Sequence, residues 1–228
     1  MARIYKLSRT GLKLLYKIRY HKGHGIHSPF VYNLVRKVIE EKAPYYAYED
    51  IKLVLDNFPG INLYPQKHNL LCFRFANYFN AKRILEIGSG YGVNTLYLTA
   101  PASNITCNCI EVSEKKNGIA KELYKNWNRN ITLFTENKFP NFSEKQDCIY
   151  LDLNDYDKFP VNIAEYISNL SYENTFIIVK GIRTNKQHKM LWKSITNIEG
   201  RTAVLDLFNI GIMFFNKRLY KWDYKISF

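Results

Sequence analysis

Short runs of apolar residues alternate along most of this chain with segments in which apolar residues recur every three or four positions. The runs have the length of buried strands, and the periodic segments have the spacing of helices that bury one face. Strands are expected at residues 83–87, 105–112, 131–135, 147–152, 174–180, 202–207 and 211–215. Helices are expected between them, at residues 93–100, 114–128, 161–169 and 185–198.

The link between the last two expected strands consists of residues 208–210 alone. A link this short cannot hold a crossover helix, so these strands form an antiparallel pair. The earlier strands alternate with helices, which is typical of a parallel sheet covered on both faces. The sequence therefore predicts an α/β fold: a Rossmann-like three-layer sandwich, with a mostly parallel seven-stranded sheet and a C-terminal antiparallel hairpin.

The N-terminal part of the chain has helical periodicity without strands. Helices are expected at residues 1–22, 29–42, 48–57 and 69–80. Ser28 and Pro29 are a typical N-cap and first residue for the second of these helices. We divide the chain into a basic helical extension, residues 1–60, and a main domain, residues 61–228.

The positive charge of the chain is concentrated in this extension. The formal net charge is +13, and nine Lys and Arg side chains precede Glu40, which is the first acidic residue. The remaining 189 residues carry 24 basic and 20 acidic side chains. Such a segment fits an anionic membrane surface or RNA, contacted through residues 1–22, or a helix docked on the protein body with a solvated Lys/Arg face. The sequence leaves these alternatives open, as it does the oligomeric state.

Neither a metal site nor a membrane span is indicated by the remaining composition. His21, His24 and His27 are spaced like metal ligands, but two intervening glycines argue against a preorganised helical site. The four cysteines lie in apolar contexts and are interpreted as reduced core residues. Since no long apolar run and no secretory signal are present, we expect a cytoplasmic protein.

A glycine-rich turn follows the strand at residues 83–87 and precedes a helix. It contains Gly88, Gly90 and Gly92 at alternate positions, and Glu86 stands two residues before the first glycine. A dinucleotide-binding turn has its third glycine five positions after the first, where this chain has Val93. A carboxylate at the end of the strand suits a cationic ligand better than a pyrophosphate.

This pattern resembles motif I of the class I S-adenosylmethionine-dependent methyltransferases. The resemblance extends over about residues 69–228, and the stretch from Gly23 to Phe30 is similar to the opening of uncharacterised bacterial methyltransferase-like proteins. It implies S-adenosyl-L-methionine as the cofactor, with the glycine turn around its methionine part. The implied binding residues are Glu86, Gly88, Ser89, Gly90, Tyr91 and Gly92.

Three later strand ends supply further candidate residues. Glu111 ends the second strand about 20 residues past the glycines, where a carboxylate can accept hydrogen bonds from both ribose hydroxyls. The resemblance places the adenine at Glu136 and Asn137, after the third strand. Asp152 ends the fourth strand and faces the reacting centre, because ligands of open α/β sheets bind at the carboxyl ends of the strands.

The chain is most similar to metal-dependent O-methyltransferases of the catechol and caffeoyl-coenzyme-A type. In these enzymes acids after strands four and five hold a divalent metal. Asp152 matches the first position, but Lys180 occupies the second. A charged ammonium repels a metal ion, so we predict no catalytic metal. Lys180 acts as a base with a lowered pKa or pairs with Asp152, and we favour the pair.

These observations predict S-adenosylmethionine-dependent methyl transfer, to oxygen, on a small acceptor. Five basic side chains follow strand five and favour an anionic acceptor: Arg183, Lys186, His188, Lys189 and Lys193. Two alternatives remain open. One is a cofactor-binding pseudoenzyme or regulator that has lost its metal site, and the other is an RNA-binding methyltransferase.

Overall fold

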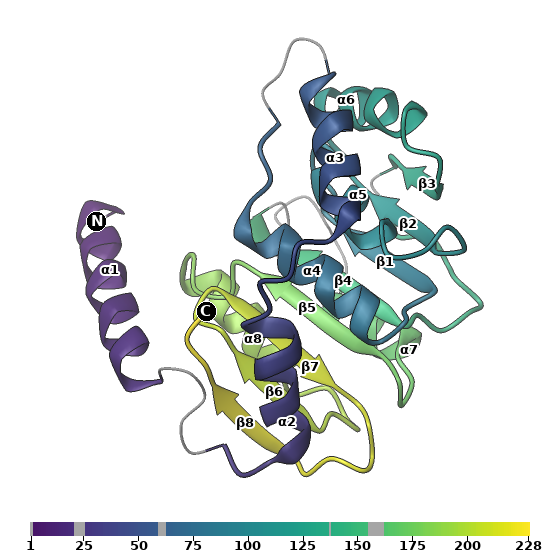
Figure 1. Cartoon of the computed structure of the whole chain (residues 1–228). Coiled ribbons are helices and arrows are strands. Elements are labelled where there is room, and N and C mark those ends of the chain that lie inside the picture. Colours follow the sequence, from purple (N-terminus) through teal and green to yellow (C-terminus); the bar gives the residue numbers. More distant parts are fainter. Residues whose placement is uncertain (1, 21–25, 59–62, 137, 155–161) are drawn as a thin grey trace.

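The computed structural model describes residues 2–20, 26–58, 63–136, 138–154 and 162–228, with only the backbone for residues 2–10 (Figure 1). Its helices are α1 (Ala2–Arg19), α2 (Pro29–Leu34), α3 (Tyr46–Asp56), α4 (Lys67–Tyr78), α5 (Val93–Thr99), α6 (Glu114–Lys125), α7 (Ile163–Leu170) and α8 (Lys186–Ile195). A short π-helix, η2 (Val35–Ile39), continues α2 directly. None of the described helices combines the length and the apolar character needed to cross a membrane.

One sheet runs through the described part of the chain. Its strands are β1 (Arg83–Ile87), β2 (Thr106–Ile110), β3 (Asn130–Phe134), β4 (Cys148–Asp152), β5 (Phe176–Lys180), β6 (Ala203–Asp206), β7 (Ile210–Phe214) and β8 (Trp222–Lys225). Their order is β3-β2-β1-β4-β5-β7-β6-β8. The first five strands in this order pair in parallel, and β7 is antiparallel to both β5 and β6. The predicted fold class and the C-terminal antiparallel hairpin are confirmed.

The described sheet has eight strands rather than the predicted seven, because β8 pairs in parallel with the edge of β6 that β7 leaves free. Little in the sequence indicates this strand. Trp222, Asp223 and Lys225 are all exposed, so β8 lacks the buried alternation that reveals a strand in a sequence. Its backbone pairing, which depends on where β6 lies, decides its structure.

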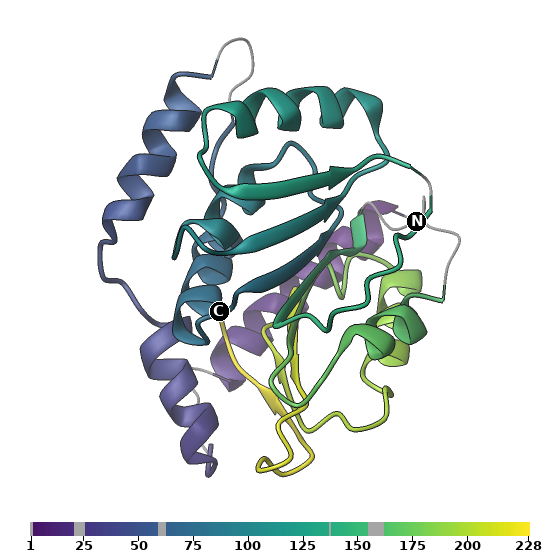
Figure 2. The same ribbon diagram turned by 90° about the vertical axis from the view of Figure 1, so that its right-hand side faces the viewer.

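Helices cover both faces of the sheet (Figure 2). Because side chains alternate along a strand, Leu85 and Ile87 of β1 pack with α7 and α8, whereas Ile84 packs on the other face with α2, η2 and α4. A third cluster joins α3, α5 and α6 around Leu96 and Leu123. The parallel strands are therefore buried on both faces, and ligands are left with the edge where these strands end.

The helix expected at residues 29–42 begins as predicted but ends at Ile39, after widening into η2. Ser28 is its N-cap, and the Ser28 hydroxyl accepts a hydrogen bond from the amide of Val31 at 3.4 Å. Val31 and Leu34 are fully buried in the same apolar cluster as the sheet. The division of the chain near residue 60 stays a prediction, but this packing joins α2 to the main body.

Candidate cofactor and active site

The glycine turn between β1 and α5 adopts a backbone that only glycine takes up without strain. Gly88, Gly90 and Gly92 have φ values of 79°, 61° and 87°, all in the left-handed region. A Cβ on Gly92 would lie 2.7 Å from the ring of Tyr124, whereas a Cβ on Gly90 would meet no atom within 4 Å. Gly92 thus serves close packing, and Gly90 borders open space.

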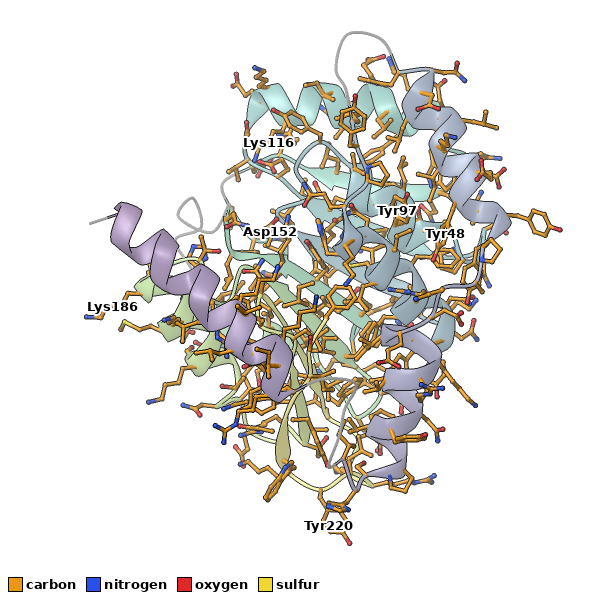
Figure 3. The ribbon with its side chains drawn as sticks, turned by 60° about the vertical axis from the view of Figure 1, so that its left-hand side comes forward. Tyr48, Tyr97, Lys116, Asp152, Lys186 and Tyr220 are labelled. Atoms are coloured by element: carbon orange, nitrogen blue, oxygen red, sulfur yellow. The ribbon has the colours of Figure 1, made fainter. Side chains whose placement is uncertain are left out.

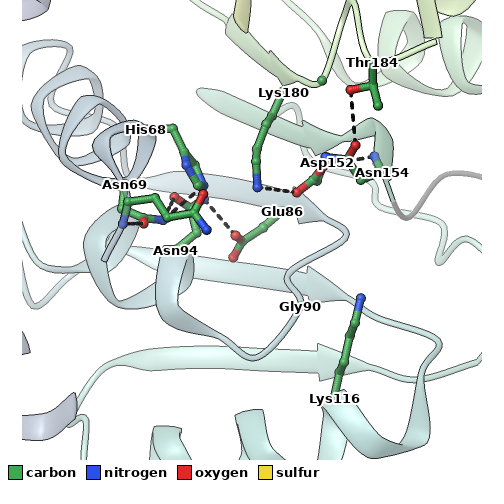
Figure 4. A network of polar contacts seen from close by, with 12 residues as sticks. His68, Asn69, Glu86, Gly90, Asn94, Lys116, Asp152, Asn154, Lys180 and Thr184 are labelled. Atoms are coloured by element: carbon green, nitrogen blue, oxygen red, sulfur yellow. Dashed lines mark hydrogen bonds and ion pairs between the residues drawn. The ribbon is translucent and has the colours of Figure 1, made fainter. Parts of the chain in front are cut away.

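Glu86 lies beneath this turn and is fully buried. Its carboxylate accepts hydrogen bonds from Asn94 Nδ2 at 2.9 Å and from Thr95 Oγ1 at 2.6 Å (Figure 4). Burial raises the pKa of Glu86 to about 7, although hydrogen bonds from Thr95 and Asn94 partly oppose the shift. Glu86 therefore changes its charge near neutral pH, and Asn94, which binds its carboxylate, lines the neighbouring cavity.

The hydrogen-bond network continues from Asn94 to helix α4. Asn69 Nδ2 donates to Asn94 Oδ1 at 2.9 Å and lies 3.3 Å from His68 Nε2, while Asn69 Oδ1 accepts from the amide of Gln66 at 2.6 Å. Figure 4 shows His68, Asn69 and Asn94 leading from the helix to Glu86. The network fixes the start of α4 against the glycine turn.

Glu111 is tied to the glycine turn from the other side and is only 1% exposed. Its carboxylate accepts hydrogen bonds from the amides of Gly90 at 3.0 Å and Ser113 at 2.9 Å. Lys116 Nζ lies 3.9 Å from the oxygen that Gly90 contacts. Glu111 thus holds the turn in place, and its carboxylate retains acceptor capacity for a further partner.

A cavity of about 400 Å³ opens above the glycine turn at the carboxyl ends of β1 and β4. The predicted site residues that line it are Gly88, Ser89, Gly90, Tyr91, Asp152 and Lys180. Glu86, Gly92 and Glu111 lie just behind this lining, and Glu136 is exposed outside it. Asn137 lies outside the described residues, as do His21 and His24. The cofactor role of each predicted residue stays a prediction.

Ser89 is the one lining residue whose buried hydroxyl lacks a hydrogen-bond partner among the described residues. The residue is 6% exposed, so solvent does little to satisfy the hydroxyl. A buried hydroxyl without a partner is costly unless a ligand supplies one. Together with the open space at Gly90, this hydroxyl shows that the cavity suits a polar ligand that approaches the backbone of the turn.

Asp152 and Lys180 face each other at the end of the cavity, because β4 and β5 are adjacent and register pairs these two residues. Lys180 Nζ lies 2.9 Å from Asp152 Oδ2. Asp152 Oδ1 accepts hydrogen bonds from the amide and the side chain of Asn154, at 3.0 Å and 2.7 Å. The predicted pair of Lys180 with Asp152 is confirmed, and both oxygens of the acid have partners.

His68 and Tyr150 also line the cavity, and their rings stack with centroids 6.5 Å apart. Burial, followed by the charge of Lys180, lowers the pKa of His68 to about 3, so the imidazole is neutral at physiological pH. The sequence pattern did not single out His68 as an active-site residue. The helix expected at residues 69–80 was the available signal, because it starts directly after His68, and the observed α4 includes His68 in its first turn.

Glu86, Cys107 and Cys109 form a buried group whose possible ligand atoms lie within 4.8 Å of one another. Cys109 donates to Glu86 at 3.6 Å, and the two sulfurs are 3.7 Å apart. The hydrogen bond to Cys109 and burial raise the pKa of the Cys107 thiol, which favours the protonated form over a metal-binding thiolate. All four cysteines are free and buried, as the sequence predicts.

A larger hollow of about 720 Å³ lies elsewhere against α4 and is lined by Arg36, Lys67 and Arg74 among others. Neither the glycine turn nor Asp152 contributes to it. The smaller cavity, which joins the turn to the strand-end pair, is therefore the candidate site.

Comparison with solved structures finds the fold of this chain in other proteins. An O-methyltransferase from Bacillus cereus, in complex with SAH, is 20% identical with a TM-score of 0.51, over 81% of this chain and 97% of that one. The methyltransferase PaMTH1 from Podospora anserina, bound to SAH, is 14% identical with a TM-score of 0.53, over 82% and 96%. This chain has the class I methyltransferase fold.

A third structure shares this methyltransferase fold: TomG, an O-methyltransferase from Streptomyces achromogenes that is involved in tomaymycin synthesis and was solved in complex with SAM. It is 15% identical with a TM-score of 0.53, over 79% of this chain and 94% of that one. No protein-family model and no curated protein matches the sequence. At such identities the likeness concerns the methyltransferase fold, and the function is argued from the site itself.

Proposed function

We propose that this chain transfers the methyl group of S-adenosylmethionine to an oxygen atom of a small, anionic acceptor, without a catalytic metal. One observation carries the proposal. A single cavity has the glycine turn, backed by Glu111, on one side and the Asp152–Lys180 pair on the other. The solved O-methyltransferases that hold SAM or SAH in the same fold support this choice of cofactor.

Residues around the glycine turn would hold the cofactor. The open space at Gly90 leaves room for its methionine part, Gly88 lines the same cavity, and the Ser89 hydroxyl offers an unused hydrogen bond. Glu111 would accept from the ribose hydroxyls, with Lys116 beside it limiting the negative charge. When bound, the cofactor supplies a methyl group activated by the positive charge of its sulfonium.

Lys180 would favour an ionised oxygen on the acceptor. Its ammonium is held at the cavity by Asp152, and a fixed positive charge stabilises an oxyanion where one develops. Among the described residues that line the cavity, Asp152 is the only acid, whereas Lys116 and Lys180 are both basic. The ammonium of Lys180 at this end of the cavity supports a phenolic, enolic or carboxylic acceptor. The neutral His68 ring would orient the acceptor by a hydrogen bond.

Replacing Glu111 with glutamine should weaken S-adenosylmethionine binding by about tenfold to a hundredfold, because hydrogen bonds to a charged acceptor contribute about 1.5–3 kcal/mol. Titration calorimetry measures this directly. Glu114→Gln, an exposed change in the first turn of α6, is the matched control and should bind like the unchanged protein. Equal affinity for Glu111→Gln and the control would remove the cofactor assignment.

Methyl transfer should be independent of divalent metal. Asp152 has both oxygens occupied, by Lys180 and Asn154, so a metal ion would have to displace one of these partners. We expect the same turnover in EDTA and in excess Mg²⁺, followed as conversion of S-adenosylmethionine in the presence of a panel of phenols and carboxylic acids. Turnover that needs Mg²⁺ would contradict the role given to Lys180.

The same occupied acid also favours a second candidate, a cofactor-binding regulator without catalysis. If the ion pair merely closes the acceptor end of the cavity, the protein will bind S-adenosylmethionine with the Glu111 dependence described above. It will then release no methyl group to any acceptor in the panel. Binding and turnover, measured separately, therefore distinguish the two functions.

A further inference from the structure

Helix α1 carries an apolar stripe that no described part of the protein covers. Leu14, Leu15 and Ile18 are 61%, 64% and 70% exposed. At about 100° per residue these three side chains fall within an arc of about 100° on the helix, which is the width of a buried face in an amphipathic helix. Contiguous exposed aliphatic side chains of this size indicate a surface that meets another phase or another molecule.

The opposite face of α1 is fixed to the protein body, so the direction of the stripe is determined. Tyr16 Oη donates to the carbonyl of Asp206 at 2.5 Å, and the Tyr16 ring lies 5.4 Å from that of Phe208. The carbonyl of Tyr20 accepts from the amide of Ser227 at 2.9 Å. Tyr16 and Tyr20 lie about half a turn from the stripe, and Figure 3 shows α1 (purple) on the outside of the molecule.

Basic side chains flank the stripe on both sides. Lys13 and Lys17 lie on one flank and Arg19 on the other, all of them exposed. The whole helix sequence, from Ala2 to Arg19, contains no acidic residue. An apolar stripe between rows of positive charge is the pattern of helices that lie in the interface of an anionic membrane.

We infer that α1 docks this protein on an anionic lipid surface through Leu14, Leu15 and Ile18. Nucleic acid would satisfy the positive charges but would leave the aliphatic stripe in water. A second copy of the chain would cover the stripe but would bring two rows of like charge together. A bilayer with anionic headgroups accommodates both features at once, because the side chains enter the acyl boundary while the Lys and Arg ends stay among the headgroups.

Docking would bring the candidate site close to the lipid surface. Ser227, whose amide donates to the carbonyl of Tyr20 at the end of α1, is followed by Phe228, and the Phe228 ring lies 4.0 Å from Lys67 Nζ at the start of α4. The next residue, His68, lines the candidate cavity. An acceptor at the membrane interface would therefore have a short path to it. The docking itself rests on α1 alone and does not depend on the proposed methyl transfer.

Co-sedimentation with vesicles tests the inference on the full chain. We expect binding to phosphatidylcholine vesicles that contain phosphatidylglycerol and little binding to phosphatidylcholine alone. The triple variant Leu14→Gln/Leu15→Gln/Ile18→Gln should lose binding at least tenfold, and Lys13→Gln/Lys17→Gln should lose about fivefold per charge. Leu53→Gln on α3, which is 61% exposed, is the matched control and should bind normally.

Other results would overturn the inference. Binding to phosphatidylglycerol vesicles that survives the triple change would show that charge alone attracts the protein. Lipid-free size-exclusion chromatography that gives a dimer for the unchanged chain and a monomer for the triple variant would assign the stripe to a second copy. Binding to an RNA oligonucleotide that depends on Lys13 and Lys17 but not on the stripe, without vesicle binding, would assign the helix to nucleic acid.

Calorimetry with S-adenosylmethionine on the triple variant keeps this test separate from that of the proposed function. The affinity of the triple variant for S-adenosylmethionine is expected to equal that of the unchanged chain.

Discussion

Replacing Gly92 with alanine will lower the free energy of unfolding by about 4 kcal/mol, the sum of two costs. The residue has a φ of 87°, where a side chain costs about 1–3 kcal/mol. The new methyl group would also lie 2.7 Å from the ring of Tyr124, and overpacking of this kind costs about 1–3 kcal/mol. The Tyr124 side chain cannot easily move away from the new methyl group, because its hydroxyl lies 2.7 Å from Thr95 Oγ1, and Thr95 Oγ1 donates a hydrogen bond to Glu86.

Gly90→Ala is the matched variant for this experiment. Gly90 has a similar backbone, with a φ of 61°, but a Cβ there meets no atom within 4 Å. The stability cost should be only about 1–2 kcal/mol. The methyl group would instead narrow the cavity that Gly90 lines, so S-adenosylmethionine affinity should fall while folding is retained. Chemical denaturation and titration calorimetry measure the two effects. Equal losses of stability in both variants would contradict the assigned packing role of Gly92.

Glu86→Gln will remove a pH-dependent part of the free energy of unfolding that amounts to about 3 kcal/mol. Each pKa unit by which the folded and unfolded states differ corresponds to about 1.4 kcal/mol. In the folded protein the pKa of Glu86 is raised from 4.5 to about 7, chiefly by burial. Between pH 4.5 and about 7 the folded state holds a proton that the unfolded state has lost. The contribution of Glu86 is therefore complete below pH 4.5 and is lost as the pH rises through about 7.

The measurement is a set of denaturation curves across this pH range for three proteins. As the pH rises, the free energy of unfolding of the unchanged chain should fall relative to that of Glu86→Gln. The curve of free energy against pH for Glu114→Gln should be parallel to that of the unchanged chain. Glutamine is close to glutamate in shape and can still accept from Asn94, so the variant should fold. Parallel curves for Glu86→Gln and the unchanged chain would show that the carboxyl group is ionised throughout.

Local sequence determined all the described strands of this protein except β8, and the order in which they occur. The apolar run at residues 83–87 and the glycines after it predict a strand and a turn, because periodicity and backbone freedom are properties of a few neighbouring residues. Adjacent parallel strands bring their carboxyl ends to one edge, and this rule was enough to place Asp152 and Lys180 together.

Tertiary structure decided what each of these residues touches. Glu86 is buried beneath the turn and held by Asn94 and Thr95, although its sequence position equally allowed a carboxylate at the surface of the cavity. His68 enters the site only because α4 packs against the glycine turn. β8 is a strand only because β6 offers it an unpaired edge. Such contacts join residues far apart in the chain, so their energies depend on how whole elements pack, and no short stretch of sequence contains that information.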